Sequence, residues 1–213
     1  MRRLLIVLLL VVVPIEGMAQ WDTVAHRRSE SIGGAIAGTT LIASGSLFTF
    51  VPEIKAVAVD FRNAVQSDNH PQLHFDDYIQ YLPGAMPLTL KAIGLESKHD
   101  WKRLVLLEGG SYLLGFTLLE SAKHGFDVLR PDGRAYNSFP SGHSFMAFTG
   151  AEVIRREYGD DYPWIAVAGY LVATVVAGMR IYNDRHWLGD IMAGAGLGVL
   201  STSAVYWIND LLE

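Results

Sequence analysis

The sequence predicts an all-α protein, a bundle of about six helices whose polar residues gather in loops at the helix ends. Three observations support this prediction. Apolar residues recur at helical spacing over several long segments, Gly and Pro residues separate those segments, and no segment keeps the apolar–polar alternation of a β-strand. The chain has 213 residues, of which 50% are hydrophobic, so it is large enough to bury the core of one domain.

Composition excludes several classes of protein. Charged residues make up 18% of the chain and the formal net charge is −5, which argues against a nucleic-acid-binding surface because such surfaces need clustered Lys and Arg. The high apolar content excludes a disordered chain. The chain contains no cysteine, so a disulfide framework, a thiolate nucleophile and a Cys-ligated metal are all ruled out.

Residues 1–19 have the features of a secretory signal peptide. Two arginines are followed by ten apolar residues, 4–13, and then by the small residues Gly17 and Ala19. The apolar run is shorter than the roughly 20 residues that a membrane-spanning helix needs. We therefore expect residues 20–213 to form a single exported helical domain, with a retained membrane anchor as the alternative.

The first half of this domain contains two clear helices and two weaker segments. Ser31 to Pro52 carries no charge and is long enough to cross a membrane or to pack inside a bundle. Asp60 to Asp77 is polar and is interpreted as a loop. Tyr78 to Leu95 is interrupted by prolines, so any helix there is short or kinked. Trp101 to His124 has apolar residues at helical spacing.

The second half is organised around a polar centre, Lys123 to Gly142, where Pro- and Gly-containing turns break any helix. Three helices are expected after it, over His143 to about Tyr158, Pro163 to Gly178, and His186 to about Ile208. The last of them contains several glycines, which permit close contact with a neighbouring helix.

Residues suited to phosphate binding lie where these helices stop. Lys123, Arg130 and Arg180 would place three cations around one anion, and a guanidinium fork matches the oxygens of a phosphate. Ser141 and Gly142 open a helix, whose backbone N–H groups and dipole favour an anion. The glycine lets that anion approach closely. The sequence therefore predicts a phosphate cradle.

Two histidines complete the predicted chemistry. His186 and Asp190 are four residues apart at the start of a helix, so the carboxylate can hold one ring nitrogen and leave the other as a nucleophile. His143 is expected at the opposite lip, where it would protonate the departing oxygen. Attack by His186 on phosphorus would give a phosphohistidine, which water activated by His143 would then cleave. This chemistry requires no metal.

The three blocks of residues resemble the signature of the type 2 phosphatidic acid phosphatase superfamily. That signature reads K-x6-RP, then PSGH, then SR-x5-H-x3-D. The blocks lie here at residues 123–131, 140–143 and 180–190, and all three spacings match. One position departs from the pattern, because Met179 stands where the family has a serine. If that serine donates a hydrogen bond to phosphate, the affinity is affected more than the type of reaction.

The resemblance implies a helical bundle and a metal-free phosphatase that needs no cofactor. The implied catalytic residues are His186, His143 and Asp190, and the implied phosphate-binding residues are Lys123, Arg130, Ser141, Gly142 and Arg180. The substrate would be a phosphate monoester, either lipid-linked or small. No nucleic acid or protein partner is expected.

A further group of polar residues is not assigned to the site. It consists of His70, His74, Asp76 and Asp77. They lie in a segment with no helical register that would make them converge on a metal ion. We interpret them as solvated or locally packed.

Two other functions and the placement of the chain stay open from sequence alone. The same cradle can hold vanadate in a haloperoxidase of this superfamily's fold, and a non-catalytic bundle would only bind anions. Uncharged runs over 162–179 and 191–208 favour membrane spans, whereas glutamates embedded in the helices favour a water-soluble bundle. In both cases we expect an exported protein, either periplasmic or facing the periplasm from the bacterial inner membrane.

Overall fold

The computed structural model describes residues 23–66 and 71–212. These residues form eight helices and contain no strand, which confirms the all-α prediction. The helices are α2 (Thr23–Phe50), α3 (Pro52–Val65), α4 (Asp76–Ile79), α5 (Leu82–Ala92), α6 (Trp101–Gly125), α7 (Gly142–Tyr158), α8 (Pro163–Tyr182) and α9 (Leu188–Leu212). The predicted signal peptide, residues 1–19, and His70 lie outside the described residues.

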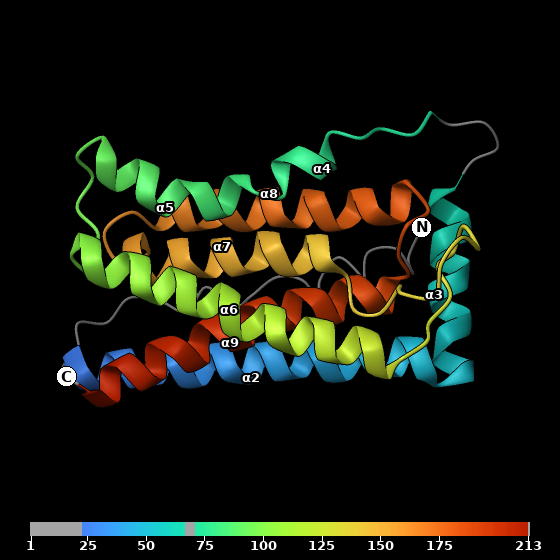
Figure 1. Ribbon diagram of the computed structural model, residues 1–213, viewed down its shortest axis with the longest axis horizontal. Helices are drawn as coiled ribbons and strands as arrows, with labels where there is room; N and C mark the ends of the chain where they lie inside the picture. The colour runs from blue at the N-terminus through green and yellow to red at the C-terminus, as the bar shows by residue number, and fades with distance from the viewer. Residues whose placement is uncertain (1–22, 67–70, 213) are drawn as a thin grey trace.

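The long helices run side by side, and α3 crosses one end of the bundle (Figure 1). α9 packs along α2, α7 and α6, and α7 also contacts α8 and α5. Almost all residues of α7 from Ser144 to Tyr158 are buried. α7 is therefore the core helix, and the surrounding helices hold its first turn in a fixed place.

α2 and α9 approach closely because glycines face each other across their contact. A Cβ atom added at Gly38 would lie 2.8 Å from the carbonyl oxygen of Gly196, and one added at Gly189 would lie 2.5 Å from that of Gly45. Distances this short do not occur for real Cβ atoms. The two backbones therefore touch only because these positions lack side chains.

The interpretation of residues 60–77 as a loop is wrong at both of its ends. α3 continues to Val65, and α4 begins at Asp76. α3 forms because Ala58 is buried and Phe61 packs against a cluster at the junction of α8 and α9. The polar residues that suggested a loop lie mainly on its exposed face.

Four helices are long and apolar enough to cross a membrane, namely α2 from Ser29 onward, α6, α8 and α9. α5 has only 11 residues and is about 16 Å long, roughly half the thickness of a bilayer's hydrocarbon core. Exposed tryptophans lie at the end of the bundle away from α3: Trp101 and Trp164 start α6 and α8, and Trp207 is near the end of α9.

Candidate active site

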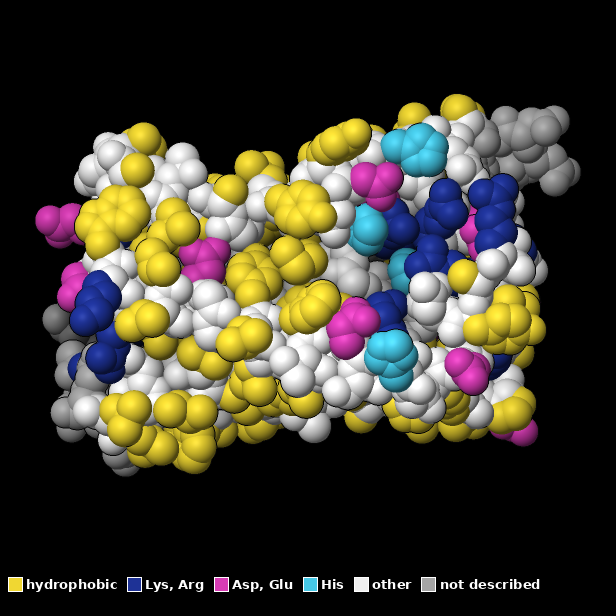
Figure 2. Space-filling model, viewed as in Figure 1, with side chains coloured by type: hydrophobic (Ala, Val, Ile, Leu, Met, Phe, Trp, Pro, Cys, Tyr) yellow, Lys and Arg dark blue, Asp and Glu magenta, His cyan; other side chains and the backbone are white. Residues whose placement is uncertain are grey.

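The end of the bundle that α3 crosses carries the residues predicted to bind phosphate. α6 and α8 end there, and α7 and α9 begin there. Figure 2 shows histidine and basic side chains gathered at this end, while apolar side chains cover much of the middle of the same face. Segments that are distant in sequence therefore meet at one place.

The loop between α6 and α7 is folded back on itself by backbone hydrogen bonds. The N–H of Ser138 donates to the carbonyl oxygen of Val128, and the N–H of Arg130 donates to that of Ala135, each over 2.9 Å. These bonds give the loop a defined shape and bring its last residues next to the start of α9.

Asn137 in this loop holds two of the predicted phosphate-binding cations. The ammonium of Lys123 donates to its backbone oxygen and the Nε–H of Arg130 to its side-chain oxygen, each over 2.9 Å. In the described part of the chain, neither cation has a carboxylate within ion-pair distance. Burial and the nearby Arg180 guanidinium lower the pKa of Arg130. Positive charges held only by neutral oxygens favour the arrival of an anion.

α7 begins at Gly142, with Ser141 as its N-cap. The buried hydroxyl oxygen of Ser141 accepts hydrogen bonds from the N–H and the hydroxyl of Ser144, over 3.4 and 3.1 Å. The N–H of Ser141 itself donates to the carbonyl oxygen of Asp190 over 3.0 Å. A Cβ atom at Gly142 would meet only Leu119, at 3.8 Å. The space beside this helix start is therefore open, and first-turn N–H groups there have no partner within the helix.

His186 is 2% exposed, and a backbone carbonyl fixes its ring. Nδ1 lies 2.8 Å from the carbonyl oxygen of Ser138. Because a carbonyl oxygen only accepts hydrogen bonds, Nδ1 carries the proton and Nε2 keeps its lone pair. No described residue forms a hydrogen bond with Nε2. Burial lowers the pKa of His186 to about 4, so the ring is neutral at neutral pH.

Asp190 supports this arrangement mainly through its neighbours. Its Oδ2 accepts hydrogen bonds from the hydroxyl of Ser138 over 2.5 Å and from the N–H of Trp187 over 2.8 Å. The same oxygen lies 3.6 Å from Nδ1 of His186, which is beyond hydrogen-bonding distance. The carboxylate therefore acts on the imidazole by charge and by holding Ser138, whose carbonyl makes the direct contact.

Arg180 is 6% exposed and is held by α4, a segment that sequence analysis did not connect with the site. Its Nη1 donates to Oδ2 of Asp76 over 2.6 Å and to Oδ1 of Asp77 over 3.2 Å. The side-chain amide of Asn183 donates to the other oxygen of Asp76 over 3.0 Å. The Nε–H of Arg180 is buried without a partner among the described residues, so this donor is left for a ligand.

His143 lies next to Arg180 and shares a carboxylate with it. Its Nε2 is 2.9 Å from Oδ1 of Asp77. Burial and the Arg180 charge lower the pKa of His143, although Asp77 opposes this effect. Burial would raise the pKa of Asp77, but the contacts with His143 and Arg180 outweigh it and lower that pKa.

Among the described residues, this cluster has candidate ligand atoms close enough together to hold a metal ion. Asp76, Asp77 and His143 each offer a ligand atom, and these atoms lie within 4.8 Å of one another. However, oxygens of both carboxylates already accept hydrogen bonds from Arg180. A divalent cation at this position would face the repulsion of that guanidinium.

Sequence analysis missed the supporting residues of the site, which are Asp76, Asp77, Asn137, Ser138 and Asn183. None of them stands in a recognisable spacing pattern. Met179, the position that departs from the family pattern, is half-buried on α8.

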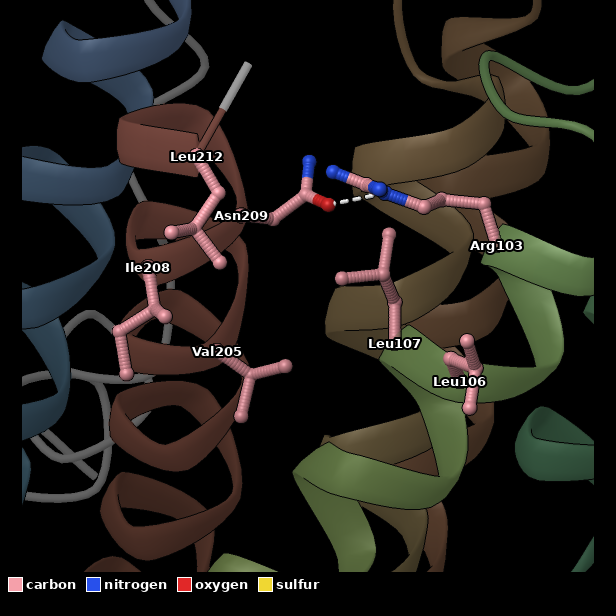
Figure 3. A pocket seen from close by; sticks show the side chains of 7 residues that line it. All are labelled: Arg103, Leu106, Leu107, Val205, Ile208, Asn209 and Leu212. Atoms are coloured by element: carbon pink, nitrogen blue, oxygen red, sulfur yellow. Dashed lines mark hydrogen bonds between the residues drawn. The ribbon is translucent and has the colours of Figure 1, made fainter.

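A separate pocket lies between α6 and α9, at the end of the bundle away from α3 (Figure 3). It is lined by Leu106, Leu107, Val205, Ile208 and Leu212, and Arg103 donates a hydrogen bond to Asn209 beside them. The pocket contains none of the predicted site residues, and five of its seven lining residues are apolar. The groups suited to phosphate chemistry are therefore found at the opposite end.

One curated relative matches part of the chain. The chain is 37% identical over 138 residues to a protein named Lipid A 1-phosphatase from Porphyromonas gingivalis, which covers 64% of this chain and 31% of that protein. The chain thus spans about a third of the length of this curated relative.

Two solved structures share the fold. The crystal structure of Aquifex aeolicus LpxE has a TM-score of 0.55 and 24% identity, and covers 73% of this chain and 94% of the other. A transmembrane PAP2 type phosphatidylglycerolphosphate phosphatase from Bacillus subtilis has a TM-score of 0.52 and 18% identity, with coverages of 86% and 98%.

The family model described as the PAP2 superfamily matches residues 103–212. This range is about half of the chain and includes all eight residues that the sequence blocks singled out. The resemblance drawn from those blocks is confirmed, and the chain belongs to the PAP2 superfamily.

Proposed function

We propose that this protein is a phosphatase that hydrolyses a lipid-linked phosphate monoester through a phosphohistidine intermediate. The observation that carries the proposal is the state of His186, whose Nδ1–H is held 2.8 Å from the carbonyl of Ser138 while Nε2 is left without a protein partner. Membership of the PAP2 superfamily and the relative named Lipid A 1-phosphatase support the same reaction on a lipid phosphate.

The phosphate group would bind between the cations and the start of α7. Lys123, Arg130 and Arg180 supply positive charge on three sides, and the open N-terminus at Gly142 supplies backbone donors. Ser141 shapes this helix start by capping it. Charge on the three non-bridging oxygens would be stabilised without reorganisation, because the donors are already held in place.

The first step would be attack by Nε2 of His186 on phosphorus. The N–P bond forms while the bond from phosphorus to the alcohol oxygen breaks, and the electron pair leaves with that oxygen. His143 gives it a proton. The imidazole becomes positively charged, and this charge is stabilised by the Asp190 carboxylate 3.6 Å away.

The second step would be hydrolysis of the phosphohistidine. His143, now neutral, takes a proton from a water molecule, and the water oxygen attacks phosphorus on the face from which the alcohol left. The N–P bond breaks, its electron pair returns to His186, and inorganic phosphate leaves. Both histidines then have the protonation states with which they began.

We also propose that the bundle is an integral membrane protein whose catalytic end faces the periplasm. The start of α2 then lies on the cytoplasmic side, so this proposal replaces the expectation of a signal peptide cleaved after residue 19. α2, α6, α8 and α9 have the length and composition of membrane spans, and many of their large apolar side chains are exposed. Exposed tryptophans at the far end of the bundle suit a membrane interface. Lys98 between α5 and α6, with Lys91 at the end of α5 and Lys102 at the start of α6, lies at that far end, where the positive-inside rule expects the cytoplasm.

The chain itself makes the orientation easy to test, because it contains no cysteine. Tyr136→Cys places a thiol in the exposed loop between α6 and α7, and Glu96→Cys places one in the exposed connection between α5 and α6. A membrane-impermeant maleimide added to intact spheroplasts should label the first variant and spare the second. The reverse pattern would reject the proposed orientation, and release of the protein by osmotic shock alone would reject membrane insertion.

Enzyme activity is tested with His186→Asn in detergent, beside wild type and an exposed control, Asp60→Asn. Wild type and control should release phosphate from lipid phosphates, while His186→Asn should lose at least about 10⁴-fold in rate. Vanadate should inhibit and EDTA should not. Rapid quenching with a ³²P-labelled lipid phosphate should trap an acid-labile, base-stable label on wild type only. If His186→Asn keeps its activity, the proposed mechanism is wrong.

A further inference from the structure

α4 brings a carboxylate to the histidine that the proposed reaction uses as its acid. Oδ1 of Asp77 lies 2.9 Å from Nε2 of His143 and 3.2 Å from Nη1 of Arg180. Its side chain is 47% exposed, so it lies at the mouth of the site, between its cationic groups and solvent. The contact joins residues 66 positions apart in the chain.

The position of this carboxylate is fixed by its buried neighbour. Asp76 is 1% exposed and accepts hydrogen bonds from Arg180 and Asn183 over 2.6 and 3.0 Å. Asn183 also makes two hydrogen bonds with the backbone of Leu73, over 3.0 and 2.6 Å. α4 is therefore tied to the end of α8, which holds the backbone of Asp77 within reach of His143.

The charged groups around His143 indicate what the Asp77 carboxylate does. The charged groups that act on His143 are Arg180 from α8 and Asp76 and Asp77 from α4. Burial and Arg180 both favour the neutral imidazole. A neutral ring that keeps its one proton on Nε2, facing Asp77, has no proton on Nδ1 to give. A carboxylate in direct contact favours the charged ring, so Asp77 counteracts this effect, although the pKa of His143 stays below its ordinary value.

We infer that Asp77 is a positioning residue that orients His143 and favours its protonated form, which gives a proton to the leaving oxygen. The inference rests on the proposed function, since it assigns an orienting group to the acid of that reaction. Nε2–H of His143 donates to Asp77, and Nδ1–H is the proton passed to the departing alcohol. After the transfer Nδ1 is bare, and it is the atom that takes a proton from water in the second step.

The inference is tested by how the effect of Asp77→Asn depends on the leaving group. An alkyl phosphate needs its leaving oxygen protonated, whereas p-nitrophenolate leaves without help. We expect Asp77→Asn to lower kcat/KM roughly 10²-fold for dodecyl phosphate and less than about 10-fold for p-nitrophenyl phosphate, both in the same micelles. kcat/KM is the right quantity because it includes the first chemical step and excludes hydrolysis of the intermediate.

The pH profile provides a second readout that a purely structural role would not move. Removal of Asp77 leaves burial and Arg180 opposed only by the weaker effect of Asp76, so the pKa of His143 falls. The alkaline limb of kcat/KM for dodecyl phosphate should therefore move to lower pH in Asp77→Asn. Asp77→Glu keeps the negative charge, so its alkaline limb should lie close to the wild-type position. Asp60→Asn, an exposed carboxylate on α3, should behave as wild type.

The outcomes separate this inference from the proposed function. An equal loss for both substrates with an unmoved limb, or no loss at all, would overturn the role of Asp77 while leaving His186 as the nucleophile. Loss of the unfolding transition in Asp77→Asn would leave Asp77→Glu as the kinetic test. The alkaline limb of its pH profile for dodecyl phosphate must then lie close to, but below, that of wild type. If His186→Asn remains active, the proposed function fails independently of either Asp77 variant.

Discussion

The two ends of the bundle treat buried charge in opposite ways. At the end away from α3, Arg155 donates two hydrogen bonds to Glu152, over 2.8 and 2.7 Å, and a third to Glu30 over 3.0 Å. At the catalytic end, Lys123 and Arg130 donate only to neutral oxygens. The Arg155 charge is matched by carboxylates, whereas the Lys123 and Arg130 charges are not, although Arg180 beside them is paired with Asp76 and Asp77.

This difference indicates what each end is for. A half-buried cation without a counterion, such as Lys123 or Arg130, costs free energy in the empty protein, so it persists where a ligand supplies the missing negative charge. A buried pair that is complete contributes to holding helices together. Charges at the catalytic end should therefore matter for activity, and charges at the other end should matter for stability.

Among substitutions of charged residues at the two ends, the largest effect on activity is expected from removing one unneutralised cation. Arg130→Ala should lower kcat/KM for a lipid phosphate by about 10²- to 10³-fold, as loss of one preorganised donor to a developing charge does. Its thermal unfolding midpoint in detergent should stay the same or rise, because the repulsion from Arg180 is relieved. A clear fall in the midpoint would contradict the comparison.

The opposite result is expected for the paired end. Glu152→Gln leaves the half-buried Arg155 and the buried Arg156 with Glu30 as their remaining carboxylate, which should cost about 3 kcal/mol of unfolding free energy. The kcat/KM of the folded fraction should be unchanged. Lys98→Ala, which removes a more exposed ion pair, serves as a control and should cost less than about 1 kcal/mol.

A smaller effect is expected at the start of α7, where one substitution should weaken anion binding without lowering stability. Gly142→Ala adds a methyl group to open space, so stability should be unchanged or slightly higher. Phosphate binding should weaken, with kcat/KM about 10-fold lower, because the methyl group occupies the place of a phosphate oxygen. Gly194→Ala is the contrasting variant, since its Cβ would lie 2.2 Å from the carbonyl oxygen of Ser141. It should lose stability and activity together.

The smallest expected signal is the titration of His186. Burial favours the neutral ring, and the pKa of His186 is lowered to about 4, so Nε2 keeps its lone pair throughout the neutral range. Histidine NMR in detergent, with His186→Asn for assignment, should show one ring titrating near pH 4. A midpoint near the unperturbed value of about 6.5 would mean that the ring is more exposed to water than its 2% exposure indicates.

Sequence analysis found the parts of the site whose residues lie close to one another along the chain. Lys123 and Arg130, or His186 and Asp190, lie within one loop or one turn of helix, so their proximity follows from local geometry. The structure places these residues at one end of the bundle, while their catalytic roles stay predictions. Glycines in the last apolar segment likewise indicated a close helix contact before its partner was known.

The parts that sequence analysis missed depend on tertiary packing. Asp77 reaches His143 only because α4 is tied to the end of α8, and nothing near either residue encodes that contact. Ser138 was overlooked because it contributes a backbone carbonyl, which every residue possesses. α3 was overlooked because its polar face resembles a loop until Ala58 and Phe61 are seen to be covered by α8 and α9.

The hydrogen bond from the N–H of Ser141 to the carbonyl oxygen of Asp190 links the two halves of the proposed machinery. It joins the turn that would receive the phosphate to the helix that supports the nucleophile, and it uses only main-chain atoms. Side-chain substitutions around the site can therefore change affinity or proton transfer without altering the distance between nucleophile and anion. Descendants of this chain could diverge in substrate while keeping the same line of attack on phosphorus.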